Sequence, residues 1–296
     1  MAIDSIRKNK LRSSLTLLGI SIGVFSVIGV MTAIRTLESS VESGLNVFAT
    51  NTFVIQKYPG ISFGSERRKH RNRKNIDYSQ YEKLKNRAQL PILVSVSEQS
   101  SVRDVKYKDR TVKNSVGLIG GDEGTVRCYN TYIADGRNFI NEDIHHIRNV
   151  CILGMDVVDR LFPFEDPLGK RIQVKGLDYT VIGLTERQGE LFGESKDNFI
   201  AIPITTYLKR FSERWTTLSI DVESQSELTY EKTKDEVIGL MRSIRKVRPE
   251  ADNDFEIVTN TEMIEQFSGF TSGIKLFALC VSVIALIVAG IGIMNI

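Results

Sequence analysis

Few residues in this chain have the types and spacing that nucleotide or phosphate chemistry requires. Gly169-Lys170 resembles the end of a phosphate-binding loop, but the glycine five residues earlier is missing and a proline turn precedes the pair. Four further glycines lack the G-x-G-x-x-G spacing of a dinucleotide site, and we interpret them as a loop: Gly117, Gly120, Gly121 and Gly124. We therefore expect no nucleotide site and no cofactor in this chain.

Residues that could act as metal ligands, acids or nucleophiles are also poorly arranged. His145 and His146 are adjacent, a spacing that fits neither an HExxH zinc site nor an i, i+4 pair. The pairs Asp122-Glu123 and Glu142-Asp143 are more typical of a loop or a helix N-terminus than of a catalytic dyad. No G-x-S-x-G motif is present. The sequence predicts neither a metal site nor an enzyme.

Two long apolar segments dominate the rest of the sequence. Ser13 to Ile34 and Leu276 to Ile296 contain no charged residue, and each would span about 30 Å as a helix. We predict transmembrane helices at 13–34 and 276–296, with a water-facing domain between them. Because nothing polar follows Ile296, we expect the chain to be a piece of a longer protein with further spans.

Basic residues before the first apolar segment predict the orientation in the membrane. Arg7, Lys8, Lys10 and Arg12 precede it, whereas Arg35 stands alone behind it. The positive-inside rule then places residues 1–12 in the cytoplasm and the middle domain outside. A cleaved signal peptide is the alternative, but its apolar region would be shorter. The expected location is a bacterial inner membrane.

The basic run from Arg67 to Lys74 has no apolar periodicity, and we interpret it as a solvated loop that could bind an anionic partner. A net charge of +3 argues against a nucleic-acid partner. Cys128 and Cys151 could form a disulfide in an oxidising compartment, although Cys151 lies in an apolar run and could equally be a lone buried thiol.

Between the apolar segments, short strands and helices alternate. Strands are expected at Thr52–Gln56, Ile92–Val96, Val102–Tyr107, Thr111–Val116, Val150–Leu153, Arg171–Val174, Tyr179–Leu184, Phe199–Ile202, Leu218–Val222 and Phe255–Val258. Helices are expected at Asp77–Arg87, between Gly154 and Leu161, at Ile204–Phe211 and at Glu227–Val247. The fold class is therefore α/β or α+β for a core domain at 51–260, with two small lobes favoured over one.

Both apolar segments are expected to continue into stalk helices, at 35–50 and at 261–275. Leu37, Val41, Leu45 and Phe48 recur on one helical face, and Thr261 with two glutamates opens the second stalk. We predict that the first stalk packs against Met263, Ile264 and Phe267 of the second, forming a stalk seam.

Small residues spaced four apart predict close helix packing in the membrane. They are Gly19 with Gly23, Gly29 with Ala33, and Ala285 with Ala289. The alternative is that small residues are simply common in membrane helices.

Several segments resemble the membrane subunits of MacB/FtsX-like ABC transporters. The segments are Asn9–Ser13, Leu15–Ile20, Ile22–Val24, the G-R-x-F segment Gly136–Phe139 followed by Glu142-Asp143, Val150–Gly154, Asp166–Lys170, Tyr179–Gly183 and Gly290–Ile296. The resemblance extends over the whole chain in the family's order.

This resemblance implies a four-span permease with an extracytoplasmic domain between its first two spans. It implies a cytoplasmic ABC ATPase partner, a homodimer or heterodimer of permeases, and a periplasmic adaptor or substrate protein as a further partner. It also implies mechanotransmission, in which ATP-driven closure moves the outer domain. The third and fourth spans and the loop that contacts the ATPase are absent here, so coupling is expected only in a longer parent chain.

Two other functions remain as alternatives. A two-span sensor would bind a ligand with its outer domain and relay the signal inward to a cytoplasmic output domain. A membrane-anchored hydrolase is disfavoured by the missing nucleophile and metal motifs. No residue selects a substrate for the transporter.

Overall fold

The computed structural model describes residues 21, 23–25, 27–36, 51–60, 70–191 and 194–294. The chain divides into two compact units. One is Leu45–Met263, and the other is formed by the segments on either side of it.

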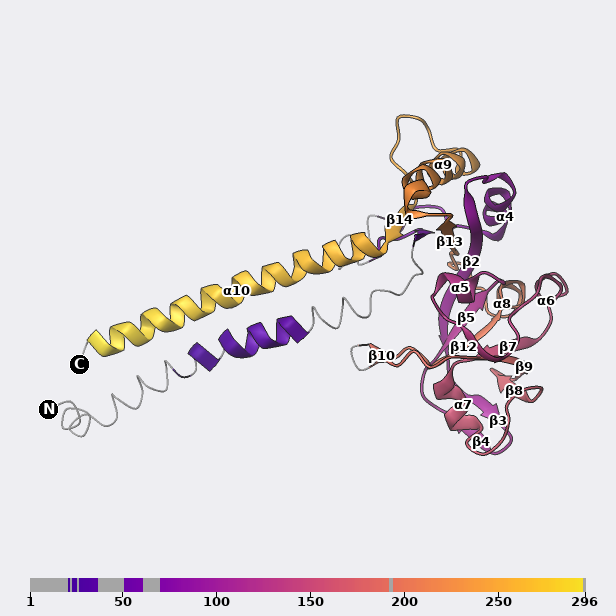
Figure 1. The fold of residues 1–296 in the computed structure, drawn as a ribbon, viewed down its shortest axis with the longest axis horizontal. Helices are drawn as coiled ribbons and strands as arrows, with labels where there is room; N and C mark the ends of the chain where they lie inside the picture. Colours follow the sequence, from indigo (N-terminus) through magenta and orange to yellow (C-terminus); the bar gives the residue numbers. More distant parts are fainter. Residues whose placement is uncertain are drawn as a thin grey trace. The chain divides into compact units, whose positions relative to one another are not determined.

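The first unit is built on one mixed sheet of 12 strands (Figure 1). Its order is β14 (Glu256–Thr259), β1 (Thr52–Gln56), β13 (Ser219–Ser224), β2 (Pro91–Val102), β5 (Val116–Gly121), β12 (Phe199–Pro203), β7 (Val150–Leu153), β9 (Leu177–Thr185), β8 (Arg171–Val174), β3 (Val105–Tyr107) and β4 (Arg110–Val112), with β6 (Ile133–Gly136) also paired to β9. The pairs β5–β12 and β7–β9 are parallel, and the other pairs of this sheet are antiparallel. The short strands β10 (Glu190–Leu191) and β11 (Glu194–Ser195) pair separately.

One hydrophobic cluster lies where α4 (Tyr78–Arg87) and α9 (Glu227–Arg245) cover the strands β1, β13 and β2. Val237 and Met241 of α9 are fully buried there, and Leu240 and Ile244 pack at its edge. These four residues recur at helical spacing in the sequence, as in an amphipathic helix. Asp77 caps α4, because its side chain accepts a hydrogen bond of 2.9 Å from the Gln80 amide.

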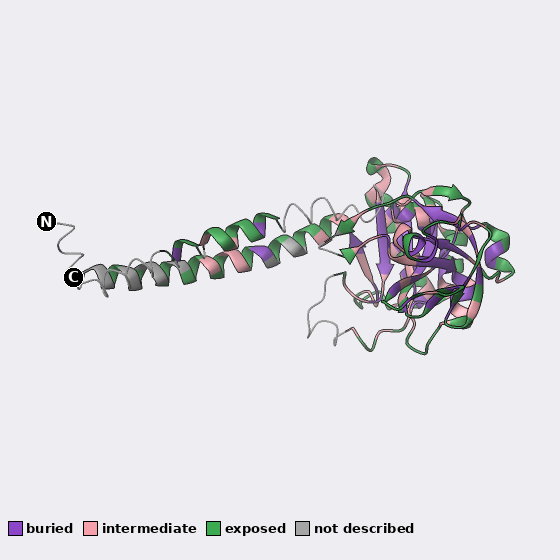
Figure 2. Ribbon diagram, turned by 90° about the horizontal axis from the view of Figure 1, so that it is seen from below, coloured by how far each residue is buried: buried purple, intermediate pink, exposed green. Residues whose placement is uncertain are grey.

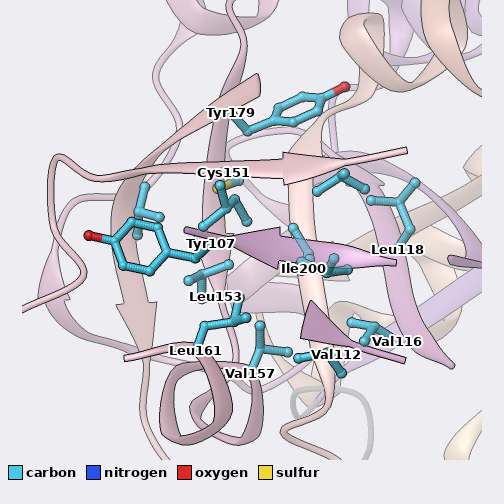
Figure 3. Packing of buried hydrophobic residues seen from close by; sticks show 14 of the residues in the cluster. Tyr107, Val112, Val116, Leu118, Cys151, Leu153, Val157, Leu161, Tyr179 and Ile200 are labelled. Atoms are coloured by element: carbon cyan, nitrogen blue, oxygen red, sulfur yellow. The ribbon is translucent and has the colours of Figure 1, made fainter. Parts of the chain in front are cut away.

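A second cluster fills the space between the other strands and the helices α7 (Met155–Leu161) and α8 (Ile204–Arg210) (Figure 3). Leu118 of β5 and Ile200 of β12 project into it together with Leu153 and Leu161. Buried residues of the unit are concentrated in the strands (Figure 2). The sheet runs without interruption through both clusters, so the predicted division into two lobes is not confirmed.

Many predicted elements are confirmed with bounds that differ by a few residues at most. β1, β7 and β8 have the predicted bounds, and α7 follows Gly154 as expected. The hairpin that joins β8 to β9 turns at Lys175 and Gly176, both with positive φ. Strongly apolar or β-branched runs bounded by glycine or proline account for these successes.

The interpretation of Gly117, Gly120 and Gly121 as a loop is wrong, because all three lie in β5 near the middle of the sheet. A Cβ on Gly120 would lie 2.6 Å from the Tyr207 Cβ, and one on Gly121 would lie 2.5 Å from the Thr125 Oγ1. Helices therefore approach β5 closely from both faces, and only glycine leaves room for them. Gly124 lies just before the short helix α5 (Thr125–Cys128).

Strand β2 is also longer than predicted, because it continues through Ser97–Ser101 to Val102. The polar residues of this stretch hid the strand, yet they pair with β5 in continuous register. The two strands predicted at Val102–Tyr107 and Thr111–Val116 are correspondingly shorter and form a hairpin. It comprises β3 and β4, while Val102 and Val116 belong to β2 and β5.

In the second unit, residues 23–25 and 27–36 are helical. The helix α10 begins at Asn260, in the first unit, and extends to Met294 in the second. Thr259 and Glu262 cap its start reciprocally, with distances of 3.0 and 3.3 Å between side-chain oxygens and amides. Among the residues that the structure describes, we find no helix that combines the length and the apolar character needed to cross a membrane. The assignment of 13–34 and 276–296 to the membrane stays a prediction.

Candidate functional site

The residues predicted to set topology lie outside the described ranges, as do most of the residues predicted for the stalk seam. They are Arg7, Lys8, Lys10, Arg12, Leu37, Val41, Leu45 and Phe48. Met263 is half-buried and Ile264 is exposed, and both lie in α10 with Phe267. The stalk seam therefore stays a prediction.

The small residues predicted to mediate helix packing are only partly described. Gly19 lies outside the described ranges, and Gly23 is buried. Gly29 and Ala33 are exposed, and a Cβ on Gly29 would meet no atom within 4 Å. Ala285 and Ala289 lie in α10. The face of Gly29 and Ala33 is thus open in a single chain.

The G-R-x-F segment begins at the end of β6, where β6 pairs with β9. Gly136 has a φ of +81°, and a Cβ there would lie 2.3 Å from the Ile182 carbonyl oxygen. A Cβ on Gly183 would lie 2.4 Å from the Arg137 carbonyl oxygen, and the Arg137 amide donates to the Ile182 carbonyl at 2.9 Å. The G-R-x-F segment and Tyr179–Gly183, which both carried the family resemblance, therefore approach each other closely through their backbones.

A buried carboxylate fixes this close approach. Asp143, at the start of α6 (Asn141–His145), accepts hydrogen bonds from Arg137 at 2.6 Å and from Arg148 at 3.2 Å. Its side chain is fully buried, whereas both arginines are about half exposed. Burial opposes its ionisation, but the hydrogen bonds from Arg137 and the Ile140 amide outweigh this effect and lower the pKa of Asp143. The acid is a structural anchor.

A second buried carboxylate, Asp122, follows the end of β5. It accepts hydrogen bonds from the Tyr81 hydroxyl at 2.6 Å, from the Ser95 hydroxyl and from the Gly124 amide at 3.0 Å. Burial raises the pKa of Asp122 despite these donors. The bonds tie α4, β2 and α5 together. Asp122 lies between β5 and α5, as expected for a loop or a helix N-terminus, but its buried bonds were not predicted.

A third buried acid, Asp221 of β13, lies on the sheet face that α5 covers. Its Oδ2 accepts a hydrogen bond of 2.8 Å from the Ser97 hydroxyl, whereas its Oδ1 has no partner among the described residues. Burial raises the pKa of Asp221 from 3.8 to about 7. Glu98 is affected in the same way, with a pKa of about 7. The alternation of Ser95 and Ser97 with Val94 and Val96 was the signal for this polar face.

The cysteines and histidines form no reactive site in the described part of the chain. Cys128 and Cys151 are both free and buried, and burial raises the pKa of each thiol, which keeps it neutral. His145 and His146 are exposed, and no group of three metal-ligating side chains occurs among the described residues.

The interpretation of Arg67–Lys74 as a solvated loop is wrong for Arg73. Its guanidinium is largely buried, pairs with Glu256 at 2.6 Å and donates to the Lys57 carbonyl at 3.2 Å. Arg71 is exposed, and residues 67–69 lie outside the described ranges. Arg73 therefore anchors the described end of the run to β14.

The sequence profile of the MacB-like periplasmic core domain matches residues 13–240. The chain is 28% identical to the macrolide export ATP-binding/permease protein MacB of Azoarcus sp. (strain BH72), covering 100% of the chain and 43% of the relative. It is 30% identical to MacB 2 of Yersinia pestis, covering 100% of the chain and 42% of the relative. The chain thus spans less than half the length of these curated relatives.

Two solved structures share the fold. The periplasmic region of MacB from Actinobacillus actinomycetemcomitans superposes with a TM-score of 0.61 at 18% identity, over 77% of this chain and 97% of that one. The extracellular domain of the ABC-type transporter YknZ from Gram-positive bacteria gives 0.54 at 17% identity, over 70% and 100%.

The mixed sheet with its two helix-covered cores is thus a mixed α/β domain of the extracytoplasmic type. The match over 13–240 shows the family, and the chain belongs to the MacB-like periplasmic core domain family of MacB/FtsX-like ABC permeases. The resemblance drawn from the sequence is confirmed.

We expect Asp143→Asn to lower the free energy of unfolding by about 1–3 kcal/mol, because the buried amide would lose the charge-assisted bonds to Arg137 and Arg148 and would turn an N–H donor towards them. Chemical denaturation of the purified chain measures this loss. The neighbouring exposed variant Glu142→Gln is the control and should change stability by less than about 0.5 kcal/mol. Equal stability of Asp143→Asn and the parent chain would remove the anchoring role of Asp143.

The raised pKa of Asp221 predicts a pH dependence. The native state keeps the proton up to about pH 7, whereas the unfolded state loses it near pH 4. The unfolded state therefore binds fewer protons in this window, and stability falls as pH rises, by on the order of 1 kcal/mol per unit of pKa difference. Asp122 and Glu98 act in the same direction.

We expect Asp221→Asn to make the fall in stability between pH 5 and pH 8 shallower, as measured by thermal unfolding across that range. Asp178→Asn, on the exposed face of β9, is the matched control and should keep the parent profile. A variant profile that is as steep as the parent profile would contradict the assignment.

Proposed function

We propose that this chain is part of the membrane subunit of a MacB/FtsX-like ABC transporter and moves its extracytoplasmic domain during the transport cycle. The observation that carries the proposal is the family match over 13–240, since the relatives are named as ATP-binding/permease proteins. The sequence itself has no phosphate loop. ATP hydrolysis is therefore assigned to a cytoplasmic ABC ATPase, on a partner chain or another domain.

The apolar segments support a position of the chain in a bacterial inner membrane, with the N-terminus cytoplasmic and the core domain outside. Residues 276–296 carry no charge, and within α10 the large apolar side chains of Leu276, Phe277, Leu279 and Ile284 are each at least 60% exposed. Exposed apolar surface of this extent suits contact with lipid or with other helices. The four basic residues before Ser13 support the orientation.

In the proposed mechanism, movement of the membrane helices reaches the outer domain through stalks that pack along the seam of Leu37, Val41 and Met263. The transporter acts as a homodimer or heterodimer of permeases, and the outer domain contacts a periplasmic adaptor or a substrate protein. Membership of the permease family favours this function over a two-span sensor. The chain itself is proposed to have no enzymatic activity, and its substrate is not assigned.

The proposal is tested by measuring the movement of the outer domain in the complete transporter. A spin label is attached at Lys232→Cys, an exposed position on α9, with Cys280 replaced by alanine. Distances between labels in the two subunits are then measured in lipid nanodiscs without nucleotide, with ATP and after vanadate trapping. We expect the distance distribution to shift by several ångströms on ATP binding, with ADP as the control.

Identical distributions in all nucleotide states, in a preparation that hydrolyses ATP, would contradict mechanotransmission. A single label per complex, with no intersubunit distance, would contradict the dimer.

A further inference from the structure

A cavity of about 300 Å³ lies on the sheet face opposite the second hydrophobic cluster. Its floor is formed by alternate residues of four adjacent strands: Ser97 and Gln99, Gly117 and Ile119, Phe199 and Ala201, and Ile152. The intervening residues Leu118 and Ile200 point into the hydrophobic cluster on the other face. The walls come from α5 and from Gln188, Ser195 and Lys196.

The space exists because small residues occupy this face at the middle of the sheet. Gly117 and Ala201 have no large side chain on this face, whereas the same two strands carry Leu118, Ile200 and Ile202 on the other. Around the cavity the face is packed by a third hydrophobic cluster that includes Phe139 and Ile152. Protein interiors are normally filled to the density of organic crystals, so the gap that this cluster leaves suits a bound molecule.

The lining defines the chemistry of that molecule. Ile119, Val126, Ile152, Phe199 and Ala201 make most of the surface apolar. Among the described lining residues, Lys196 is the single charged one. A mainly apolar and neutral ligand therefore suits the cavity, and its volume, at the lower end of ligand sites, suits a compound of one or two rings.

A hydrogen-bond acceptor lies in the floor. The Ser97 hydroxyl donates its hydrogen to Asp221 and lies 3.2 Å from the Tyr129 hydroxyl, from which its oxygen accepts, so one lone pair of Ser97 is left for a ligand. A ligand with a hydroxyl or amide donor would bond this oxygen.

We propose that this cavity is a binding site for a small, neutral and mainly apolar molecule that carries a hydroxyl or amide hydrogen-bond donor. Such a ligand would contact β2, β5, β12 and α5 at once. The site is independent of the proposed transport mechanism, since it lies wholly within the Leu45–Met263 unit.

The test uses 2-naphthol as the probe, because it is neutral at pH 7, has two rings and has one hydroxyl donor. Its binding to the 296-residue chain in lipid nanodiscs is measured by equilibrium dialysis against empty nanodiscs. We expect saturable binding of one probe per chain above the lipid background. Absence of saturable, chain-dependent binding would overturn the proposal.

Two variants locate the binding. Ala201→Phe places a ring in the cavity and should weaken binding at least tenfold, while Ile202→Val, on the opposite face of the same strand, should leave it within twofold. If Ala201→Phe fails to fold, Thr131→Trp fills the cavity from its rim and should have the same effect. Undiminished affinity in a folded, cavity-filled variant would overturn the site.

A second probe tests the acceptor chemistry. 2-Methoxynaphthalene keeps the rings but has no hydroxyl donor, and it should bind at least fivefold more weakly than 2-naphthol after correction for partition into lipid. Equal affinity of the two probes would overturn the requirement for a donor.

Discussion

The close approach of helices to both faces of β5 is the constraint on which the rest of the domain depends. Tyr207 of α8 packs on one face at Gly120, and Thr125 of α5 packs on the other at Gly121. In the sheet order, β5 joins the strands that line the first cluster to those that line the second. A side chain larger than hydrogen at either glycine would push a helix away and loosen the junction.

Helix α8 strengthens the same junction from one side. Its Ile204 belongs to the first cluster, its Tyr207 belongs to the second, and Leu208 packs against both. The opposite side of the junction is polar, because Asp122, Ser95 and Thr125 bind one another under α5. The two larger hydrophobic clusters are thus held together by one sheet, one bridging helix and one buried hydrogen-bond network.

The sequence predicted the elements that have strong local signals. β1 and β7 are runs of β-branched and apolar residues, and α4 has an aspartate cap, so each is specified by its own residues. β5 was missed because its glycines disfavour a strand locally, and only the neighbouring Tyr207 and Thr125 explain them. β2 was cut short because Ser97–Ser101 is polar, although the strand is completed by pairing with β5.

The functional features, like the strands and helices, were predicted only where the signal lies within one segment of the sequence. The G-R-x-F segment was one of several that carried the family resemblance, yet its physical role is visible only when Gly136 meets Ile182 and Arg137 meets Asp143. Asp221 and the cavity were not found, because their residues are distant in the sequence and meet only across the sheet. Contacts of long sequence separation cannot be read from periodicity, which reports one element at a time.

The central claim is that one continuous sheet makes the domain a single cooperative body. Native-state hydrogen exchange of the purified chain tests it, by comparing the slowest amides of β9, in the second cluster, with those of β13, in the first. The same opening free energy is expected for both strands, because they unfold together. An opening free energy lower by about 2 kcal/mol or more for one of the two strands would mean that the domain consists of two separately unfolding lobes, which would contradict the single cooperative body.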